Sequence, residues 1–84
     1  MSDNEHPRTM LNNELQKKYG PSAQDHVTWE IYSQGPPNAL TWHATIYIDD
    51  MNYGYASSRT AGGAQDFAAK TAYNHLKREK SSRR

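Results

Sequence analysis

The chain has no cysteine, and its other absences narrow what it can be. Without cysteine, neither a disulfide framework nor a thiolate zinc site can stiffen it, and its four histidines do not follow a metal-ligand spacing such as HExxH. No apolar run is long enough to cross a bilayer, and the polar, acidic start MSDNEHPRT is unlike an export signal. We therefore expect a soluble intracellular protein with no metal, no cofactor and no membrane contact.

Catalytic motifs are also missing. Asp49 and Asp50 are adjacent carboxylates, but neighbours on a strand point to opposite faces, so we interpret them as turn residues. No Ser-His-Asp spacing, phosphate loop or nucleotide fingerprint occurs, and 84 residues leave little room for a closed pocket. The sequence thus predicts one small non-catalytic domain with no small-molecule substrate.

The net charge of +1 hides an uneven distribution. Residues 1–58 carry three Lys or Arg against seven Asp or Glu, a balance of −4, whereas residues 59–84 carry seven against two, a balance of +5. A basic C-terminal third suits an anionic partner, nucleic acid above all, although a solvated helix face and a basic tail give the same pattern. The final KREKSSRR fits a nuclear signal or an RNA-binding tail, and it equally fits a solvated helix end.

Hydrophobic periodicity predicts a helix, three strands and a second helix. The first helix, from residue 9 to 19, has Thr9 as its cap and ends at Gly20-Pro21. Residues 27–34 and 41–49 alternate as antiparallel strands across the loop of residues 35–40, and DDMNYG leads into a shorter edge or bent strand at 53–57. The predicted inward positions are Val27, Trp29, Ile31, Trp42, Ala44, Ile46 and Ile48, and the outward ones are Thr28, Glu30, Tyr32, Thr41, His43, Thr45 and Tyr47.

From Thr60 the pattern becomes helical, with a stripe of small residues. The stripe consists of Ala61, Ala64, Ala68, Ala72 and Leu76, with Asp66, Lys70, Tyr73 and Lys77 opposite. The predicted fold is α+β, an α-β-β-β-α two-layer sandwich whose three-stranded antiparallel sheet carries both helices on one face. On the other face, Tyr32, His43 and Tyr47 either stack unpaired bases or form cross-strand pairs, and His75 is expected to be a packing residue.

Three segments of this pattern resemble the double-stranded RNA-binding domain. MLNNELQ is similar to its first helix, GPPNALTWHATIYI to its loop and second strand, and AQDFAAKTAYNHL to its Ala-rich second helix. The resemblance covers roughly residues 9–77 and implies a domain over 9–78, with a disordered tail at 1–8 and a basic tail at 79–84.

The resemblance also implies shape-specific binding of double-stranded RNA with little sequence preference. Three regions would form the site: the first helix, the loop between the first two strands, and the start of the second helix. The residues that fall there are Thr9, Asn13, Gln16, Pro36, Pro37, Asn38, Arg59, Ala61, Gly62 and Gln65.

This chain departs from the family at the start of the second helix. Ala61, Gly62 and Gln65 stand where the family has a lysine cluster, and Asn38 stands where a histidine is common. Unshielded N–H groups at Gly62 and Gly63 could replace the lysines by contacting phosphate, or the glycines could serve packing alone. Additional attraction would come from Arg59 and from Lys17, Lys18, Lys77, Arg78, Lys80, Arg83 and Arg84.

A second hypothesis follows from the missing lysines. A domain of this fold that has lost RNA binding would serve as a protein-interaction or dimerisation module. The third strand, with Phe67 and Tyr73 of the second helix, would then form the contact surface.

Overall fold

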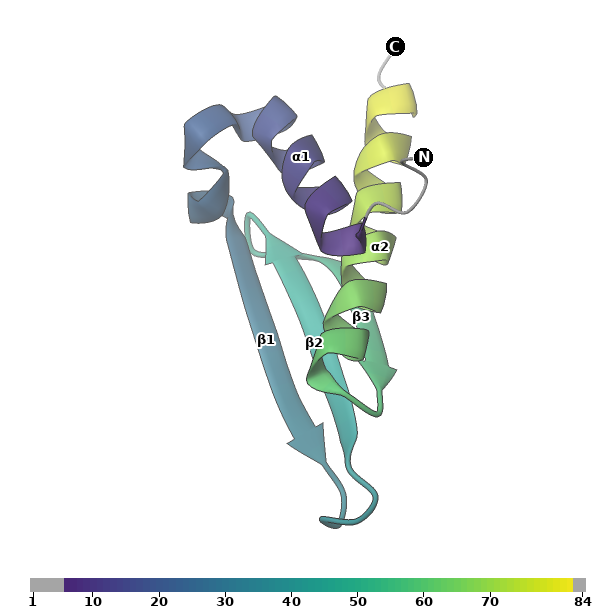
Figure 1. The fold of residues 1–84 in the computed structure, drawn as a ribbon. Coiled ribbons are helices and arrows are strands. Elements are labelled where there is room, and N and C mark those ends of the chain that lie inside the picture. The colour runs from purple at the N-terminus through teal and green to yellow at the C-terminus, as the bar shows by residue number, and fades with distance from the viewer. Residues whose placement is uncertain (1–5, 83–84) are drawn as a thin grey trace.

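The computed structural model describes residues 6–82, which form two helices packed on one face of a three-stranded sheet (Figure 1). The elements are α1 (Pro7–Tyr19), the 3-10 segment η2 (Gly20–His26), β1 (Val27–Gln34), β2 (Thr41–Ile48), β3 (Met51–Ser58) and α2 (Ala61–Ser82). The sheet is antiparallel in the order β1-β2-β3. The predicted α-β-β-β-α sandwich is confirmed.

The first helix begins two residues before its predicted start. His6 is the cap, because its ring Nδ1 accepts a hydrogen bond from the Arg8 N–H at 3.3 Å, and Pro7 occupies the first turn. Thr9 lies inside the helix and is not its cap, so that prediction is wrong. The helix ends as predicted at Gly20, whose φ of 69° suits glycine.

Two aspartates form the tight turn between β2 and β3. Asp49 and Asp50 have φ values of 53° and 67°, a left-handed pair that matches the twist of a two-residue hairpin. This confirms them as turn residues. A register shift between Ile46 and Tyr47 marks a bulge at Tyr53 of β3, because Ile46 pairs with Gly54 and Tyr47 with Asn52, and the extra residue Tyr53 is buried.

The core lies between the helices and β2 and β3. Ile46, Ile48, Leu11, Leu15 and Leu76 are almost fully buried. The alanine stripe of α2 is buried at Ala64, Ala68 and Ala72, as predicted, together with Ala69, while Ala61 is half-buried. Tyr73 was expected on the outer side, but it packs against the core because α1 lies beside this part of α2.

Two strand positions differ from the alternation. Ile31 was expected inward, yet its side chain is 39% exposed, because α2 packs on β3 and β2 and barely touches β1. Thr45 was expected to face water, yet it is buried between the larger Glu30 and Tyr55 of the neighbouring strands.

His75 is a packing residue, as expected. Its ring stacks on Tyr53 with centroids 4.3 Å apart, and its Nε2 lies 3.6 Å from Glu79. Glu79 also accepts a hydrogen bond from the Tyr53 hydroxyl at 2.7 Å.

Candidate nucleic-acid interface

The first region of the predicted site is the exposed side of α1. Thr9, Asn13 and Gln16 are all exposed, and their spacing of four and three residues places them on one side of the helix. Leu11 and Leu15 anchor the opposite side in the core. The short polar groups therefore stand together on a fixed element, where they can hydrogen-bond to hydroxyls or phosphates.

The second region is the tip of the β1–β2 hairpin. Residues 31–40 are all exposed, so the hairpin extends past the helices (Figure 1). A turn shapes the tip: the Ala39 N–H donates to the Pro36 carbonyl at 2.9 Å, and Gly35 has a φ of 104°. Pro36, Pro37 and Asn38 therefore project at the end of a stiff loop.

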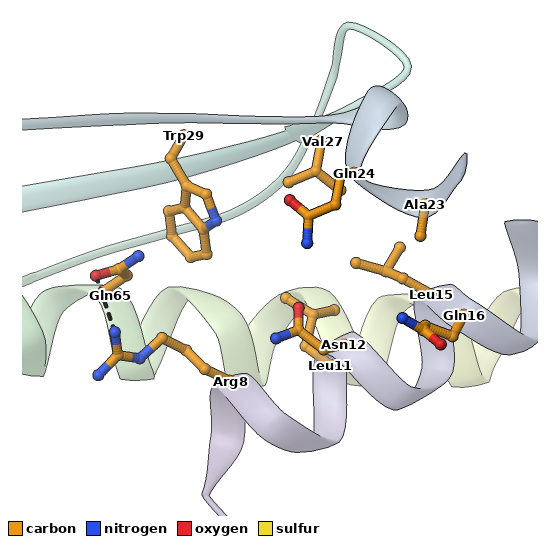
Figure 2. Close-up of a pocket in the computed structure, with 10 residues that line it drawn as sticks. All are labelled: Arg8, Leu11, Asn12, Leu15, Gln16, Ala23, Gln24, Val27, Trp29 and Gln65. Atoms are coloured by element: carbon orange, nitrogen blue, oxygen red, sulfur yellow. Dashed lines mark hydrogen bonds between the residues drawn. The ribbon is translucent and has the colours of Figure 1, made fainter. Parts of the chain in front are cut away.

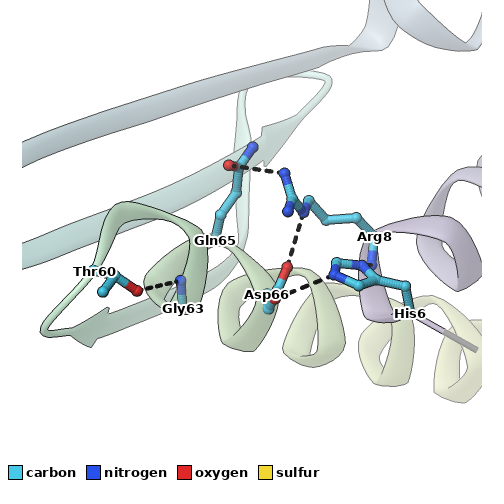
Figure 3. Close-up of polar contacts among 6 residues, drawn as sticks. All are labelled: His6, Arg8, Thr60, Gly63, Gln65 and Asp66. Carbon is cyan, nitrogen blue, oxygen red and sulfur yellow. Dashed lines mark hydrogen bonds and ion pairs between the residues drawn. The ribbon is translucent and has the colours of Figure 1, made fainter. Parts of the chain in front are cut away.

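The third region is the first turn of α2, where two adjacent glycines meet different surroundings. Thr60 caps the helix, since its hydroxyl accepts from the Gly63 N–H at 2.9 Å and its carbonyl accepts from the Ala64 N–H at 3.0 Å (Figure 3). A Cβ on Gly63 would lie 2.6 Å from the Ser58 hydroxyl and 2.9 Å from the Thr60 hydroxyl. Gly63 thus permits the cap to pack closely, and its N–H is already used.

The two preceding amides are free. Within residues 6–82, the N–H groups of Ala61 and Gly62 have no hydrogen-bond acceptor, and a Cβ on Gly62 would meet nothing within 4 Å. These donors lie at the positive end of a long helix with no acidic residue in its first turn. The turn can therefore accept an anion at the position of the missing lysines.

Arg8, which was predicted to lie in a disordered tail, reaches the next turn of α2 from α1. Arg8 Nε donates to Asp66 Oδ1 at 2.8 Å, and its Nη1 donates to Gln65 Oε1 at 3.3 Å (Figure 3). On the other side of Asp66, His6 Nε2 lies 3.3 Å from Oδ2. The side chain of Arg8 is 42% exposed, which leaves part of its guanidinium open to a ligand. No local pattern could predict this contact, because 58 residues separate Arg8 from Asp66.

The remaining predicted cations are spread around the molecule. Arg59 is exposed just before α2, and Lys17 is 67% exposed, 3.9 Å from Glu14. Lys18 instead pairs with Glu79 at 3.6 Å, and Lys77 lies over the Tyr73 ring. Arg83, Arg84 and the side chain of Lys80 fall outside the described part of the chain, as do residues 1–5 of the predicted tail.

The open face of the sheet carries an aromatic ladder across three strands. Tyr32 stacks on His43 with centroids 4.9 Å apart, and His43 stacks on Tyr55 at 6.0 Å with its Nδ1 2.7 Å from the Tyr55 hydroxyl. The rings of Tyr32 and Tyr55 each stack on His43, so the three side chains contact one another across the strands. The cross-strand interpretation therefore fits better than the base-stacking one. Tyr47 bonds to Glu30 instead, at 3.1 Å.

The three regions follow one another along the molecule, with α1 at one end, the start of α2 in the middle and the β1–β2 loop at the other end (Figure 1). Within residues 6–82 there is no cluster of three His, Cys, Asp or Glu side chains suited to a metal ion. No helix in that range has the length and apolar character needed to cross a membrane.

A protein-family model matches most of the chain. The sequence model of the double-stranded RNA binding motif matches residues 7–76, which include α1, the whole sheet and most of α2. A comparison with curated protein sequences found no significant match.

Proposed function

We propose a function for this chain, which belongs to the double-stranded RNA binding motif family. It reads the shape of an A-form duplex without catalysis and with little sequence preference. In this proposal α1 and the β1–β2 loop enter two successive minor grooves. The start of α2 contacts the phosphates of the major groove between them. The order of the three regions along the molecule supports this assignment (Figure 1).

The observation that carries the proposal is the free first turn of α2. The N–H groups of Ala61 and Gly62, the open space at Gly62 and the absence of a nearby carboxylate in that turn suit a phosphate oxygen. Arg59 precedes this turn in the chain, and Arg8 contacts Gln65 and Asp66 of the next turn, so both can supply cations near it. Phosphate binding here relies on backbone donors and two arginines in place of a lysine cluster.

A variant at the first helical position tests the role of the amides. Ala61→Pro removes one N–H donor, and proline is well tolerated at this position because its fixed φ suits the helix start. We expect a severalfold weaker affinity for an RNA duplex of about 16 base pairs, the footprint of such a domain. The melting temperature should not fall. Unchanged affinity with an intact fold would overturn the phosphate role of this turn.

The second candidate is a protein-interaction module of the same fold. Phe67 is 60% exposed on α2, Tyr55 is 50% exposed on β3, and β3 is an edge strand with no neighbour on its outer side within the described chain. Light scattering over a range of concentrations tests self-association. A rise in mass that Phe67→Ser abolishes would favour this candidate, whereas a constant monomer mass would exclude a homodimer.

The proposed ligand also leads us to propose an intracellular location, in the cytoplasm or nucleus. Imaging of the tagged chain, with and without residues 79–84, would test whether the basic end acts as a nuclear signal. Equal distribution of both forms would exclude that role.

A further inference from the structure

A cavity of about 300 Å³ lies between α1, η2, β1 and the start of α2 (Figure 2). Its volume is at the lower end of the range for small-molecule sites. Figure 2 shows the indole of Trp29 extending from β1 toward the helices, between Gln65 on one side and Gln24 on the other. None of the elements around it closes it completely, so a flat group could enter from the side.

The walls of this cavity carry an unusual set of polar groups. Four carboxamides line it, from Asn12 and Gln16 of α1, Gln24 of η2 and Gln65 of α2. A carboxamide has both a donor and an acceptor, and Asn or Gln can form paired hydrogen bonds with the edge of adenine. The Gln65 oxygen already accepts from Arg8, so this residue contributes its amide donors. Arg8 is the only charged residue of the lining, and no carboxylate belongs to it. An aromatic wall, neutral amides and one guanidinium suit a nucleobase that is attached to a phosphate.

The cavity is continuous with the proposed duplex-binding surface. Gln16 belongs to the exposed set on α1, and Gln65 to the start of α2, and both side chains also line the cavity. A paired base cannot present its hydrogen-bonding edge there, whereas an unpaired base leaves the stack at low cost. We therefore propose that the cavity binds a single unpaired nucleobase at a bulge, so that the domain prefers an interrupted RNA duplex to a perfect one. This inference rests on the proposed function.

Two RNA duplexes test the proposed nucleobase site. They share one sequence and differ only by a single bulged adenosine, and fluorescence anisotropy gives the affinity for each. We expect the bulged duplex to bind severalfold more tightly. In a Trp42→Phe background, which leaves Trp29 as the sole tryptophan, only the bulged duplex should quench the emission by stacking on the indole.

A substitution at Gln24 changes the cavity without changing the proposed duplex-binding regions, because η2 is not one of these three regions. Gln24→Ala should abolish the preference for the bulged duplex and leave the affinity for the perfect duplex unchanged. Asn74→Ala, which removes an exposed carboxamide of α2 outside the cavity, should change neither value.

The failures of the two proposals are distinguishable. Equal and tight binding of both duplexes would overturn the nucleobase site and leave duplex binding intact. A preference that Gln24→Ala does not reduce would overturn the assignment to this cavity. Binding of neither duplex would overturn the proposed function itself, and the nucleobase site with it.

Discussion

Gly62 and Gly63 illustrate how adjacent identical residues acquire different roles. Gly63 is surrounded by the hydroxyls of Ser58 and Thr60, and a side chain would displace the cap. Gly62 faces open space, and its N–H is unused within the described chain. A glycine here weakens the helix by roughly 0.5–1 kcal/mol relative to alanine. Packing does not require glycine at this position, and the open space is compatible with the proposed approach of a phosphate to the backbone.

Replacement of Gly62 by glutamate should separate stability from binding. A carboxylate in the first turn favours the helix by about 0.3–1 kcal/mol through the helix dipole, and glutamate is a better helix former than glycine. We therefore expect Gly62→Glu to melt no lower than the parent but to bind an RNA duplex at least severalfold more weakly. Gly62→Ala, which keeps the N–H and adds no charge, should melt higher and bind nearly as well. Equal affinities for both variants would contradict a phosphate at this turn.

Substitutions at Arg8 and at Asp66 should change the affinity for an RNA duplex in opposite directions. If the guanidinium contacts phosphate, Arg8→Gln weakens duplex binding and lowers the salt slope of log K by about 1. Asp66→Asn removes the competing carboxylate and should strengthen binding, measured by titration at several salt concentrations. Were Arg8 only a link between the helices, both variants would lower the melting temperature and neither would change the salt slope.

At the scale of elements, α2 lies so close to β3 that only small residues fit between them. The backbone contact is at Gly54, where a Cβ would lie 2.4 Å from the Ala68 carbonyl oxygen and 3.1 Å from the Ala72 nitrogen. The buried alanines on the facing side of α2 have the same cause. This close packing fixes the direction of α2 and therefore the place of its first turn relative to the sheet.

Gly54→Ala should consequently be far more damaging than Gly62→Ala. One methyl group at Gly54 forces the helix away from the strand, and overpacking of this kind typically costs about 1–3 kcal/mol. Urea denaturation of the two variants measures the difference in the free energy of unfolding. Similar stabilities would contradict the close contact of α2 with β3 at Gly54.

The elements themselves were largely predictable, since strands with one buried face alternate and the alanine stripe of α2 has helical spacing. Features that depend on residues far apart in the sequence were not predictable from local patterns. The exposure of Ile31 depends on where α2 ends over the sheet, and the burial of Tyr53 depends on a bulge. Arg8 and Gln65 are 57 residues apart in the sequence, so no local pattern indicates their contact. The predicted contact residues are exposed, apart from the half-buried Ala61 and Gln65, and their roles in RNA binding stay predictions.

At the scale of the whole molecule, two tyrosine–carboxylate bonds connect the segments at one end of the sandwich. The Tyr19 hydroxyl donates to Asp49 Oδ2 at 2.8 Å, which joins the end of α1 to the β2–β3 turn. The Tyr53 hydroxyl donates to Glu79 Oε2 at 2.7 Å, which joins β3 to the last turns of α2. Burial, then the bond to Asp49, raises the pKa of Tyr19 to about 12, and the bond to Glu79, then burial, raises the pKa of Tyr53 to about 12.

These shifts predict a loss of stability in alkali. A raised tyrosine pKa stabilises the folded state below the unfolded value of about 10, and this stabilisation disappears as the pH rises to about 12. The melting temperature should therefore fall between pH 10 and 12, and the fall should be smaller in Tyr53→Phe. Identical alkaline profiles for the parent and the variant would contradict the role of the Tyr53 bond.

The carboxylates of the same two pairs predict a loss of stability at low pH. Hydrogen bonds from His26 and Tyr19 lower the pKa of Asp49, and the bond from Tyr53 lowers the pKa of Glu79. Carboxylates with lowered pKa stabilise the folded state above their unfolded values near 4, and this contribution is lost as the pH falls through the folded values. Asp49→Asn keeps a residue suited to the left-handed turn. Its melting temperature should fall less steeply than that of the parent as the pH is lowered. An equally steep fall of the melting temperature in the variant and the parent would exclude the Asp49 carboxylate as a cause of the acid destabilisation.

We propose that the domain reads duplex RNA although it lacks the lysine cluster of its family. The most direct test titrates the chain with a labelled RNA duplex of about 16 base pairs and with a DNA duplex of the same sequence, each at low and physiological salt. We predict binding to RNA that weakens as salt rises, with clearly poorer binding to DNA. Equal affinity for RNA and DNA, or no salt-dependent binding to either, would contradict the claim and favour the protein-interaction candidate.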